Sequence, residues 1–392
     1  MSLSSYNNAI KWLQLHLVKD VGPKTFANLL EAFGDIDGVL SASIYKLAMI
    51  KGISQKKAEF IYYSMRDDSK ARYEYDLACK LGIEILTIAD DDYPPLLKQI
   101  DDPPHVLYVK GDIVRSDNLS VAIVGSRTCS QYGYEQASRL SHLLAAAGVT
   151  VISGLARGID TVAHRGAIAG GGRTIAVQGR GLGGVFPPEN EDLAEIISAN
   201  GAVVSELPVS FEPIGSNFPA RNRIIAGMSL ATIIVEARKR GGALITARLA
   251  QEYNREVMAV PGRVDNPCSE GPNTLIREGA TLVTGIDDIM EALGSIGSTL
   301  KDYARDMAGH AQSKLDMPLF SSDDLNLTDD ERLILDKIES EPIHIDAVIY
   351  HSGRKPGLVN SVLTSLQLKG LIRQMPGGFF VRKPGKIADV VR

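Results

Sequence analysis

The chain has 392 residues, of which 44% are hydrophobic and 23% charged, and its formal net charge is -5. This is the composition of a globular protein with two or three domains, and the acidic balance argues against a protein that coats DNA by bulk attraction, although a local basic groove stays compatible with it. The sequence has no apolar run of membrane-spanning length and lacks the pattern of a signal peptide. Its three cysteines, Cys79, Cys129 and Cys268, have no metal-ligand spacing, so we expect a cytoplasmic protein without a disulfide framework, a metal or a cofactor.

Residues 1–75 are predicted to form a helical domain with two similar hairpins, at residues 18–27 and 50–58. Both have the helix-hairpin-helix (SAM-like) pattern, in which the amides of a tight turn and a following lysine can face a phosphate backbone. Asp20 and Ser54 stand where this pattern usually has glycine. Contact with DNA and contact with protein both stay open, and the carboxylate of Asp20 makes the first hairpin the weaker DNA candidate.

From Leu119 the hydrophobic pattern changes to short apolar segments that alternate with helix-length segments such as 134–147 and 189–199. This alternation predicts an α/β fold over residues 76–295, with a Rossmann-like, doubly wound, mostly parallel sheet covered on both faces. Ligands of such sheets bind outside the carboxyl ends of the strands. The predicted strands are residues 121–124, 149–152, 174–177, 202–204, 231–235 and 256–260.

Small, polar and basic residues follow these strands, where a ligand is expected. The guanidinium groups of Arg127, Arg221 and Arg223 suit bidentate contact with phosphate oxygens, and the ring of Phe218 suits stacking on a base. The small-residue turn at 153–156 can offer backbone amides to a further phosphate. The candidate DNA-binding residues are Gly125, Ser126, Arg127, Ser153, Gly154, Leu155, Ala156, Arg157, Phe218, Arg221, Asn222, Arg223, Gly242 and Thr246.

The arginines have a structural alternative. Arg221 and Arg223 could form salt bridges with Glu206 and Glu236 that hold the mouth of the sheet together, and both roles are compatible. The two glutamates could form a carboxylate pair only if their strands are adjacent, and otherwise they could bind backbone amides or the arginines.

Two further patterns invite enzymatic interpretations. Asp160 and His164 lie one helical turn apart, which suits a carboxylate that orients an imidazole, but we favour a helix-capping Asp and a packed His. Residues 179–184 match G-x-G-x-x-G, yet Val185 to Pro188 separate the glycines from the next helix, so we predict a wide loop rather than a dinucleotide site. No nucleophile with a base and no metal motif is present, so these residues do not amount to a catalytic set.

After Leu293 the sequence turns polar, which predicts a linker at 296–326 and a winged-helix domain at 327–392. Thr328 and Glu331 form a capping-box pattern at the start of a helix that ends near Ile338, a second short helix ends at Gly353, a third runs from about 356 to 368, and a hairpin surrounds 376–378. DNA contact and protein contact are equally compatible with this domain. The basic residues near the third helix and the wing are Arg354, Lys355, Lys369, Arg373, Arg382, Lys383 and Lys386.

A series of motifs in this order resembles the bacterial DNA-processing protein A family (DprA, also called Smf). The resemblance covers nearly the whole chain and includes the terminal domains. The motifs are residues 93–97, 102–108, 124–127, 153–160, 163–164, 186–190, 218–227, 235–237, 244–247, 260–262 and 271–276.

The resemblance implies a non-enzymatic mediator of recombination that binds and protects incoming single-stranded DNA without strong sequence preference. It further implies a homodimer formed through the Rossmann-like domain, near residues 271–279, and loading of the recombinase RecA during natural transformation. The chain departs from the family pattern where Gly241 precedes Gly242, since Ser-Gly is frequent there, and in the loop 178–183, where Gly183 replaces a carboxylate and Arg180 is added. An added Arg180 could strengthen phosphate contact or change the shape of the loop.

Two other function classes stay open. One is a nucleotide-processing enzyme of the phosphoribohydrolase kind on a related Rossmann-like fold, although the sequence lacks the Pro-Gly-Gly-x-Gly-Thr element expected of that class. The other is a scaffold whose terminal domains bind proteins. Turnover of nucleoside monophosphates would identify the first, and salt-independent or absent binding of oligonucleotides would favour the second.

Overall fold

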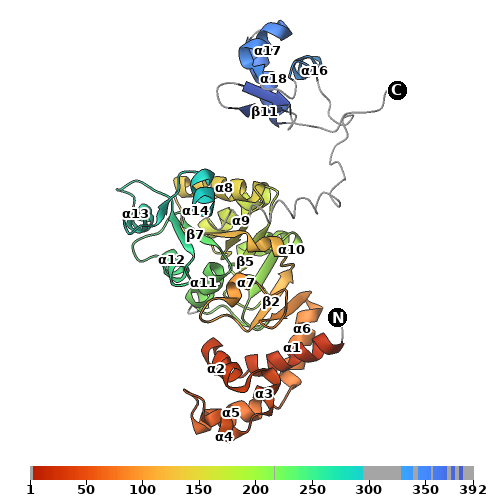
Figure 1. Cartoon of the computed structure of the whole chain (residues 1–392), viewed down its shortest axis with the longest axis vertical. Helices are drawn as coiled ribbons and strands as arrows, with labels where there is room; N and C mark the ends of the chain where they lie inside the picture. Colours follow the sequence, from red (N-terminus) through yellow and green to blue (C-terminus); the bar gives the residue numbers. More distant parts are fainter. Residues whose placement is uncertain are drawn as a thin grey trace, which may run out of the picture. The chain divides into compact units, whose positions relative to one another are not determined.

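The computed structural model describes residues 3–215, 217–294, 328–338, 343–354, 356–368, 372–375 and 379–382 (Figure 1). The chain divides into two compact units, Met1–Asp306 and Met307–Arg392. The predicted linker at 296–326 lies outside the described residues. None of the helices within the described ranges is long and apolar enough to cross a membrane.

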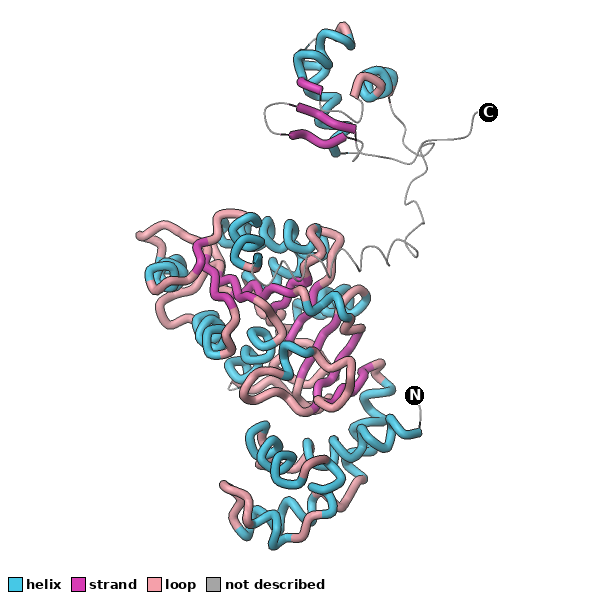
Figure 2. The backbone as a smooth tube through the Cα atoms, in the orientation of Figure 1, coloured by secondary structure: helices cyan, strands magenta, loops and turns pink. Residues whose placement is uncertain are grey.

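The first part of the larger unit is helical, as predicted (Figure 2). Its two hairpins share one backbone geometry: Asp20 has φ 67° and Gly52, at the equivalent position of the second hairpin, has φ 85°. Asp20 therefore adopts the left-handed conformation that glycine usually supplies. Ser54 accepts a hydrogen bond from the amide of Lys57 and caps its helix. The helices are α1 Leu3–His16, α2 Pro23–Phe33, α3 Ile36–Ser41, α4 Ile44–Ala48, α5 Gln55–Ser64 and α6 Ser69–Lys80.

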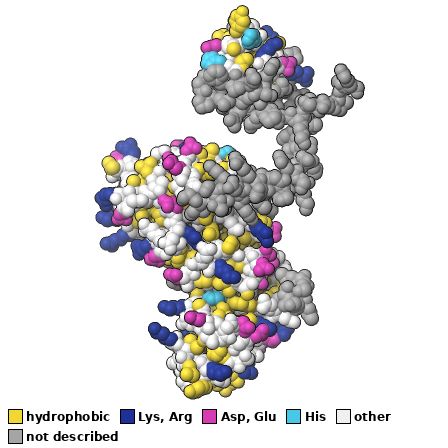
Figure 3. All heavy atoms as spheres, in the orientation of Figure 1, with side chains coloured by type: hydrophobic (Ala, Val, Ile, Leu, Met, Phe, Trp, Pro, Cys, Tyr) yellow, Lys and Arg dark blue, Asp and Glu magenta, His cyan; other side chains and the backbone are white. Residues whose placement is uncertain are grey.

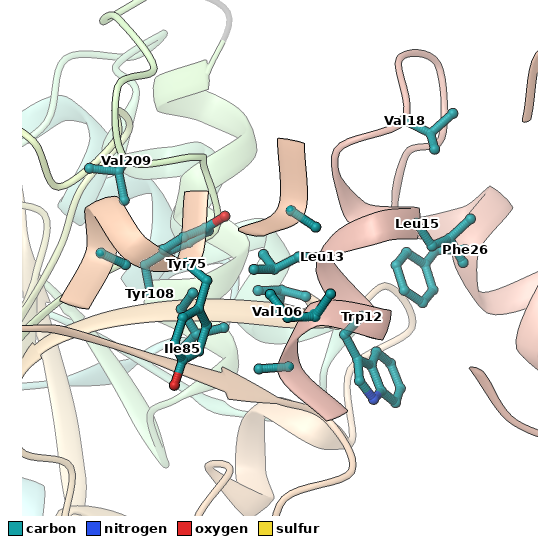
Figure 4. Packing of buried hydrophobic residues seen from close by; sticks show 14 of the residues in the cluster. Trp12, Leu13, Leu15, Val18, Phe26, Tyr75, Ile85, Val106, Tyr108 and Val209 are labelled. Atoms are coloured by element: carbon teal, nitrogen blue, oxygen red, sulfur yellow. The ribbon is translucent and has the colours of Figure 1, made fainter. Parts of the chain in front are cut away.

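A continuous apolar cluster joins these helices to the α/β domain. Figure 4 shows Leu13 of α1, Phe26 of α2 and Val106 among the side chains of this cluster. The ring of Phe26 stacks on that of His105, with centroids 4.3 Å apart and planes 10° from parallel. In addition, Glu74 accepts a hydrogen bond of 2.6 Å from the amide of Val209. The first hairpin is therefore part of a packed seam within this unit.

The α/β domain contains a sheet in the order β1-β2-β6-β5-β4-β3-β7-β8-β9. All neighbours from β6 to β9 are parallel, while β1 pairs with β2 and β2 with β6 in antiparallel fashion. The mostly parallel sheet and its strands β3 to β8 are thus confirmed, and β1, β2 and β9 were not predicted. The strands are β1 Ile83–Thr87, β2 Val106–Gly111, β3 Ser120–Val124, β4 Thr150–Ser153, β5 Thr174–Val177, β6 Ala202–Ser205, β7 Ala231–Ile234, β8 Glu256–Ala259 and β9 Thr281–Leu282.

Helices cover both faces of this sheet, which confirms the doubly wound architecture (Figure 1). One face packs on α8, α9 and α14, and the other on α7, α11 and α12. The chain proceeds from β3 outward to β6 and then returns to β7 on the other side of β3. The loops after β3 and β7 therefore diverge, and such a switch point is where α/β sheets bind ligands. The helices are α7 Pro95–Lys98, α8 Gln131–Ala146, α9 Ile159–Ala169, α10 Glu191–Ala199, α11 Asn217–Gly227, α12 Ala243–Glu252, α13 Glu270–Arg277 and α14 Ile286–Ala292.

The second unit has the predicted winged-helix architecture, in which three helices pack on a sheet of order β10-β12-β11. The side chain of Thr328 accepts from the amide of Glu331, whose own carboxylate accepts from the amide of Thr328, so the capping box is confirmed. Arg354 forms a salt bridge of 2.8 Å with Asp330. Arg373 and Arg382 belong to β11 and β12, and the other basic residues that we singled out lie outside the described residues. Its elements are α16 Asp329–Leu335, β10 Ile343–His344, α17 Ile345–Ser352, α18 Pro356–Leu368, β11 Ile372–Met375 and β12 Phe379–Arg382.

Candidate functional site

A pocket of about 560 Å³ lies at the switch point of the sheet, beyond the carboxyl ends of β3 and β7. The loop after β3, the start of α11 and the loop leading into α12 form its walls. The structure brings many of the candidate residues together here. Those that line the pocket are Gly125, Ser126, Arg127, Ala156, Phe218, Arg221, Asn222, Gly242 and Thr246. Those placed elsewhere are Ser153, Gly154, Leu155, Arg157 and Arg223.

A larger hollow of about 740 Å³ lies beside α1 and β1. Its lining includes four carboxylates, those of Glu84, Asp90, Asp91 and Asp92. Neighbouring Asp112, Asp92 and Asp90 add to desolvation in raising the pKa of Glu84, so the local potential is negative. A phosphate would be repelled there, and we therefore assign the candidate site to the switch-point pocket.

Two aromatic rings meet at the mouth of the pocket. The centroids of Phe186 and Phe218 lie 5.4 Å apart with planes tilted by 38°, and the guanidinium carbon of Arg127 lies 5.5 Å from the centroid of Phe218. Gly179 makes this position of Phe218 possible, because a Cβ at Gly179 would lie 2.9 Å from Cδ1 of the ring. The half-buried Phe218 is thus held by packing and by a cation–π contact, and it can offer ring surface to a base.

The groups that favour an anion lie at the start of α12 and in the loops after β3 and β7. The N-cap of α12 is Gly242, which has no side chain, and the amides of Leu244 and Ile245 donate to the backbone carbonyls of Gly241 and Gly242. The positive end of the helix dipole therefore opens on the pocket. Arg127 and Arg238 are exposed and line the same pocket, so both guanidinium groups can reach a phosphate. We did not predict Arg238, although its place in the basic run directly before Gly241 was a usable signal.

Arg221 corrects one of our expectations. It is buried, and its Nη1 donates to the backbone carbonyls of Gly154 and Val177. Burial lowers the pKa of Arg221 to about 10, while the carboxylate of Asp160 opposes that effect. Although Arg221 lines the pocket, its guanidinium group is hydrogen-bonded at the ends of β4 and β5. It therefore supports the floor of the site and is not a free guanidinium group for bidentate phosphate contact.

The small-residue turn after β4 also differs from our expectation. Burial raises the pKa of Asp160 to about 6, and the groups that lower it are Arg221 and the backbone amides of Ala156, Gly154 and Gly125. These amides therefore face a carboxylate of the protein itself, which takes the place that we predicted for a phosphate. A Cβ at Gly154 would lie 2.6 Å from a carboxylate oxygen of Asp160, so this close approach requires glycine.

Arg223 takes the structural role that we weighed as its alternative. It pairs with Glu206 and, at 3.3 Å, with Asp102, away from the pocket. Burial raises the pKa of Glu206, and Arg223 partly offsets this shift. Glu236 instead accepts from the amide of Ser130 at 2.8 Å and from its hydroxyl at 2.5 Å. Glu206 and Glu236 follow β6 and β7, which β5, β4 and β3 separate, so the two carboxylates do not form a pair.

Hydrogen bonds hold the turn after β4 in position. Asn190 donates to the carbonyl of Leu155 at 2.9 Å and to the hydroxyl of Thr161 at 2.8 Å. Leu155 is buried with φ 57°, an uncommon conformation for a residue with a side chain. The exposed Arg157 pairs with Glu189. Asn190 was not among our candidates, and its role as a positioning residue is visible only in the fold.

His164 is packed, as we favoured. Its Nδ1 lies 2.7 Å from the hydroxyl of Thr174, and burial lowers its pKa to about 3. The neutral imidazole is enclosed within the domain, and Asp160 is engaged by the turn amides rather than by the histidine. Within the described residues, no group of three or more His, Cys, Asp or Glu side chains is arranged to hold a metal ion.

The glycine run at 179–184 forms the predicted loop. A Cβ at Gly181 would lie 1.9 Å from the carbonyl oxygen of Pro208, so the loop packs tightly on the segment after β6. A short 3-10 helix, Pro188–Asn190, precedes α10, and the helix therefore does not open on the glycines. Arg180 lies 3.7 Å from Glu212 with its side chain 15% exposed. Its effect is accordingly on the shape of the loop.

The sequence model described as DNA recombination-mediator protein A matches residues 84–294, which is more than half of the chain. The chain belongs to this family. A model of the DprA winged helix domain matches residues 321–378, and one of a SAM-like helix-hairpin-helix tandem matches residues 14–67. The resemblance stated from the motifs is confirmed, and membership supports a role in DNA processing and recombination mediation.

Individual relatives agree with this assignment. The chain is 33% identical to Protein Smf of Synechocystis over 95% of its own length and 98% of the relative. It is 39% identical to Protein Smf of Escherichia coli, over 73% and 74% of the two chains. The X-ray structure of DNA processing protein A from Streptococcus pneumoniae is similar to it with a TM-score of 0.64 and 34% identity, covering 74% of this chain and 98% of that one.

Proposed function

We propose that the switch-point pocket binds single-stranded DNA, with phosphates at Arg127, Arg238 and the start of α12 and one base against Phe218. The observation that carries this proposal is the combination of exposed guanidinium groups, a helix N-terminus without a side-chain cap and an aromatic pair in one pocket. Such a combination recognises a nucleotide chain by charge and by stacking, both of which are independent of sequence. The remaining candidate residues shape the pocket or its floor.

We further propose that the protein carries out no chemical step on the strand. Asp160, which lines the pocket, and Glu236, which precedes the lining residue Ala237, are both engaged by backbone amides. As a mediator, the protein would protect an incoming strand and load RecA on it during natural transformation, acting in the cytoplasm as a homodimer of the α/β domain. Assembly of RecA on a strand precoated with single-strand-binding protein tests the loading step, and sedimentation of the protein alone tests the dimer.

The pocket assignment is tested by the salt dependence of oligothymidylate binding. Each phosphate contact on a single strand contributes about 0.7 to the slope of log K against log salt, so replacing Arg127 and Arg238 by Ala should flatten that slope by about 1.4. The matched control replaces Arg115 and Arg165, which are exposed and do not line the pocket. An equal change in both double variants would show that only general charge matters, and the pocket assignment would then be wrong.

A further inference from the structure

The two hairpins of the helical domain have equal geometry but different surroundings. The turn of the first lies at the seam with the α/β domain, where Val18 and Lys19 line a cavity of about 310 Å³ together with Pro104 and His105. The seam, including the stacked rings of Phe26 and His105, already occupies the face beside this turn. The turn of the second hairpin carries Lys51 and is exposed. Lys19 and Lys24 of the first hairpin are exposed as well, so the second hairpin is distinguished by charge, because its turn has Gly52 where the first has the carboxylate of Asp20.

The segment that carries the second hairpin is basic within an acidic chain. Residues 43–66 contain five basic residues and one acidic residue, Glu59. Lys57 contacts the hydroxyl of Thr25 at 3.5 Å, whereas Lys46, Lys51 and Lys56 are exposed. This local positive charge favours a polyanion.

Large hydrophobic side chains are exposed on α4 and α5, the two helices of the second hairpin. On α5, Lys56, Phe60 and Tyr63 follow one another at a spacing of four and three residues, so they share one face of the helix, opposite the buried Ala58 and Ile61. Tyr63 is 67% exposed. On α4, which packs against α5, Tyr45 is 73% exposed, and Met49, directly after α4, is 70% exposed. Figure 3 shows hydrophobic and basic side chains at the end of the molecule where Figure 1 places α4 and α5.

We propose that this surface, made of Tyr45, Lys51, Lys56, Phe60 and Tyr63, is a second contact surface for single-stranded DNA. Exposed rings between lysines suit an unpaired strand, because each base offers a face for stacking and each phosphate a charge for a lysine. Duplex DNA hides the base faces, and an acidic polypeptide has no bases to stack. The surface shares no residue with the lining of the switch-point pocket.

The two hairpins supply a matched pair of variants. Lys51→Ala with Lys56→Ala removes two charges from the second hairpin, and Lys19→Ala with Lys24→Ala removes them from the equivalent positions of the first. Both pairs are measured with full-length protein in which Arg127→Ala and Phe218→Ala weaken the pocket. Fluorescence anisotropy of a long oligothymidylate then reports the remaining binding at several salt concentrations.

The second-hairpin pair should flatten the salt slope by about 1.4, since two phosphate contacts are lost, while the first-hairpin pair should leave it unchanged. Tyr63→Ala should weaken binding about fivefold or more and Tyr63→Phe should retain it, because stacking needs the ring and not the hydroxyl. Equal effects of both lysine pairs, or none, would overturn the proposal. Displacement of the oligothymidylate by polyglutamate at equal charge concentration would also overturn it, in favour of a protein-contact surface. If the variant with Arg127→Ala and Phe218→Ala binds oligothymidylate as tightly as wild type, the pocket assignment is wrong. The proposal for the second hairpin is not affected by that result.

Discussion

Replacing Arg221 by Met should destabilise the α/β domain rather than remove a phosphate contact. The variant leaves the buried Asp160 without its cationic partner and the carbonyls of Gly154 and Val177 without a donor. Leaving a buried charge without its compensating cation typically costs about 3–5 kcal/mol. For a domain of this size that corresponds to a fall in Tm of about 6–20 °C near neutral pH.

The loss should depend on pH, because Asp160 can respond by taking up a proton. Its folded pKa of about 6 lies above the ordinary value of 3.8, so its contribution to stability is complete below 3.8 and is lost as pH rises through about 6. Without Arg221 the buried carboxyl of Asp160 must stay protonated at pH 8. Because pH 8 is two units above the wild-type pKa of about 6, this protonation adds about 2.7 kcal/mol to the loss of stability. At pH 5.5 Asp160 is already largely protonated, and this part of the loss should nearly vanish.

Urea denaturation at pH 5.5 and pH 8 measures the effect, with wild type and Arg221→Met compared at each pH. The double variant Arg221→Met with Asp160→Asn is the control, and it should lack the additional loss at pH 8. The reasoning would be refuted if Arg221→Met were as stable as wild type at both pH values and had a flatter salt slope for oligothymidylate binding. Arg221 would then be a phosphate ligand.

Three further predictions concern the support of the site and the fold. Gly179→Ala should weaken oligothymidylate binding about fivefold by displacing the ring of Phe218, at the lower end of the stacking range, and unchanged affinity in anisotropy would contradict this. Asn190→Ala should lower the free energy of unfolding by about 1–3 kcal/mol, since a buried carbonyl and hydroxyl lose their donor, and an unshifted urea midpoint would argue otherwise. Desolvation lowers three histidine pKa values from the ordinary 6.5, so their stabilising effect is complete above pH 6.5 and is lost as pH falls toward 4. With Asp160 acting in the opposite direction, stability should fall by about 2–3 kcal/mol per pH unit near pH 5, and pH-resolved melting that shows no such fall would exclude this linkage. The histidines are His16, His105 and His164.

The sequence was sufficient for the central strands because each is an uninterrupted apolar run buried on both faces. The edge strands were harder to see. In β1 the exposed Glu84 interrupts the apolar run, and β9 has two residues, so neither gives a clear periodic signal. The two hairpins of the helical domain and the winged helix were predictable because turns and capping boxes depend on a few residues that are adjacent in the sequence.

The types of residue at the site were also predictable, but their directions were not. Arg221 and Arg223 are two positions apart on α11, so they point to nearly opposite sides of the helix and cannot both face one pocket. Which of them turns inward depends on the ends of β4 and β5 and on Asp102, which are distant in sequence. For the same reason the occupation of the turn amides by Asp160 became visible only in the fold.

The central claim, that the pocket binds an unpaired strand, is tested most directly by titrating fluorescent oligothymidylate with the protein in the presence of duplex competitor, at several salt concentrations. The account predicts binding that weakens steeply with salt, that duplex does not displace, and that falls when Arg127, Arg238 and Phe218 are replaced by Ala. Binding that duplex displaces at equal nucleotide concentration, or that survives the triple replacement unchanged, would contradict it.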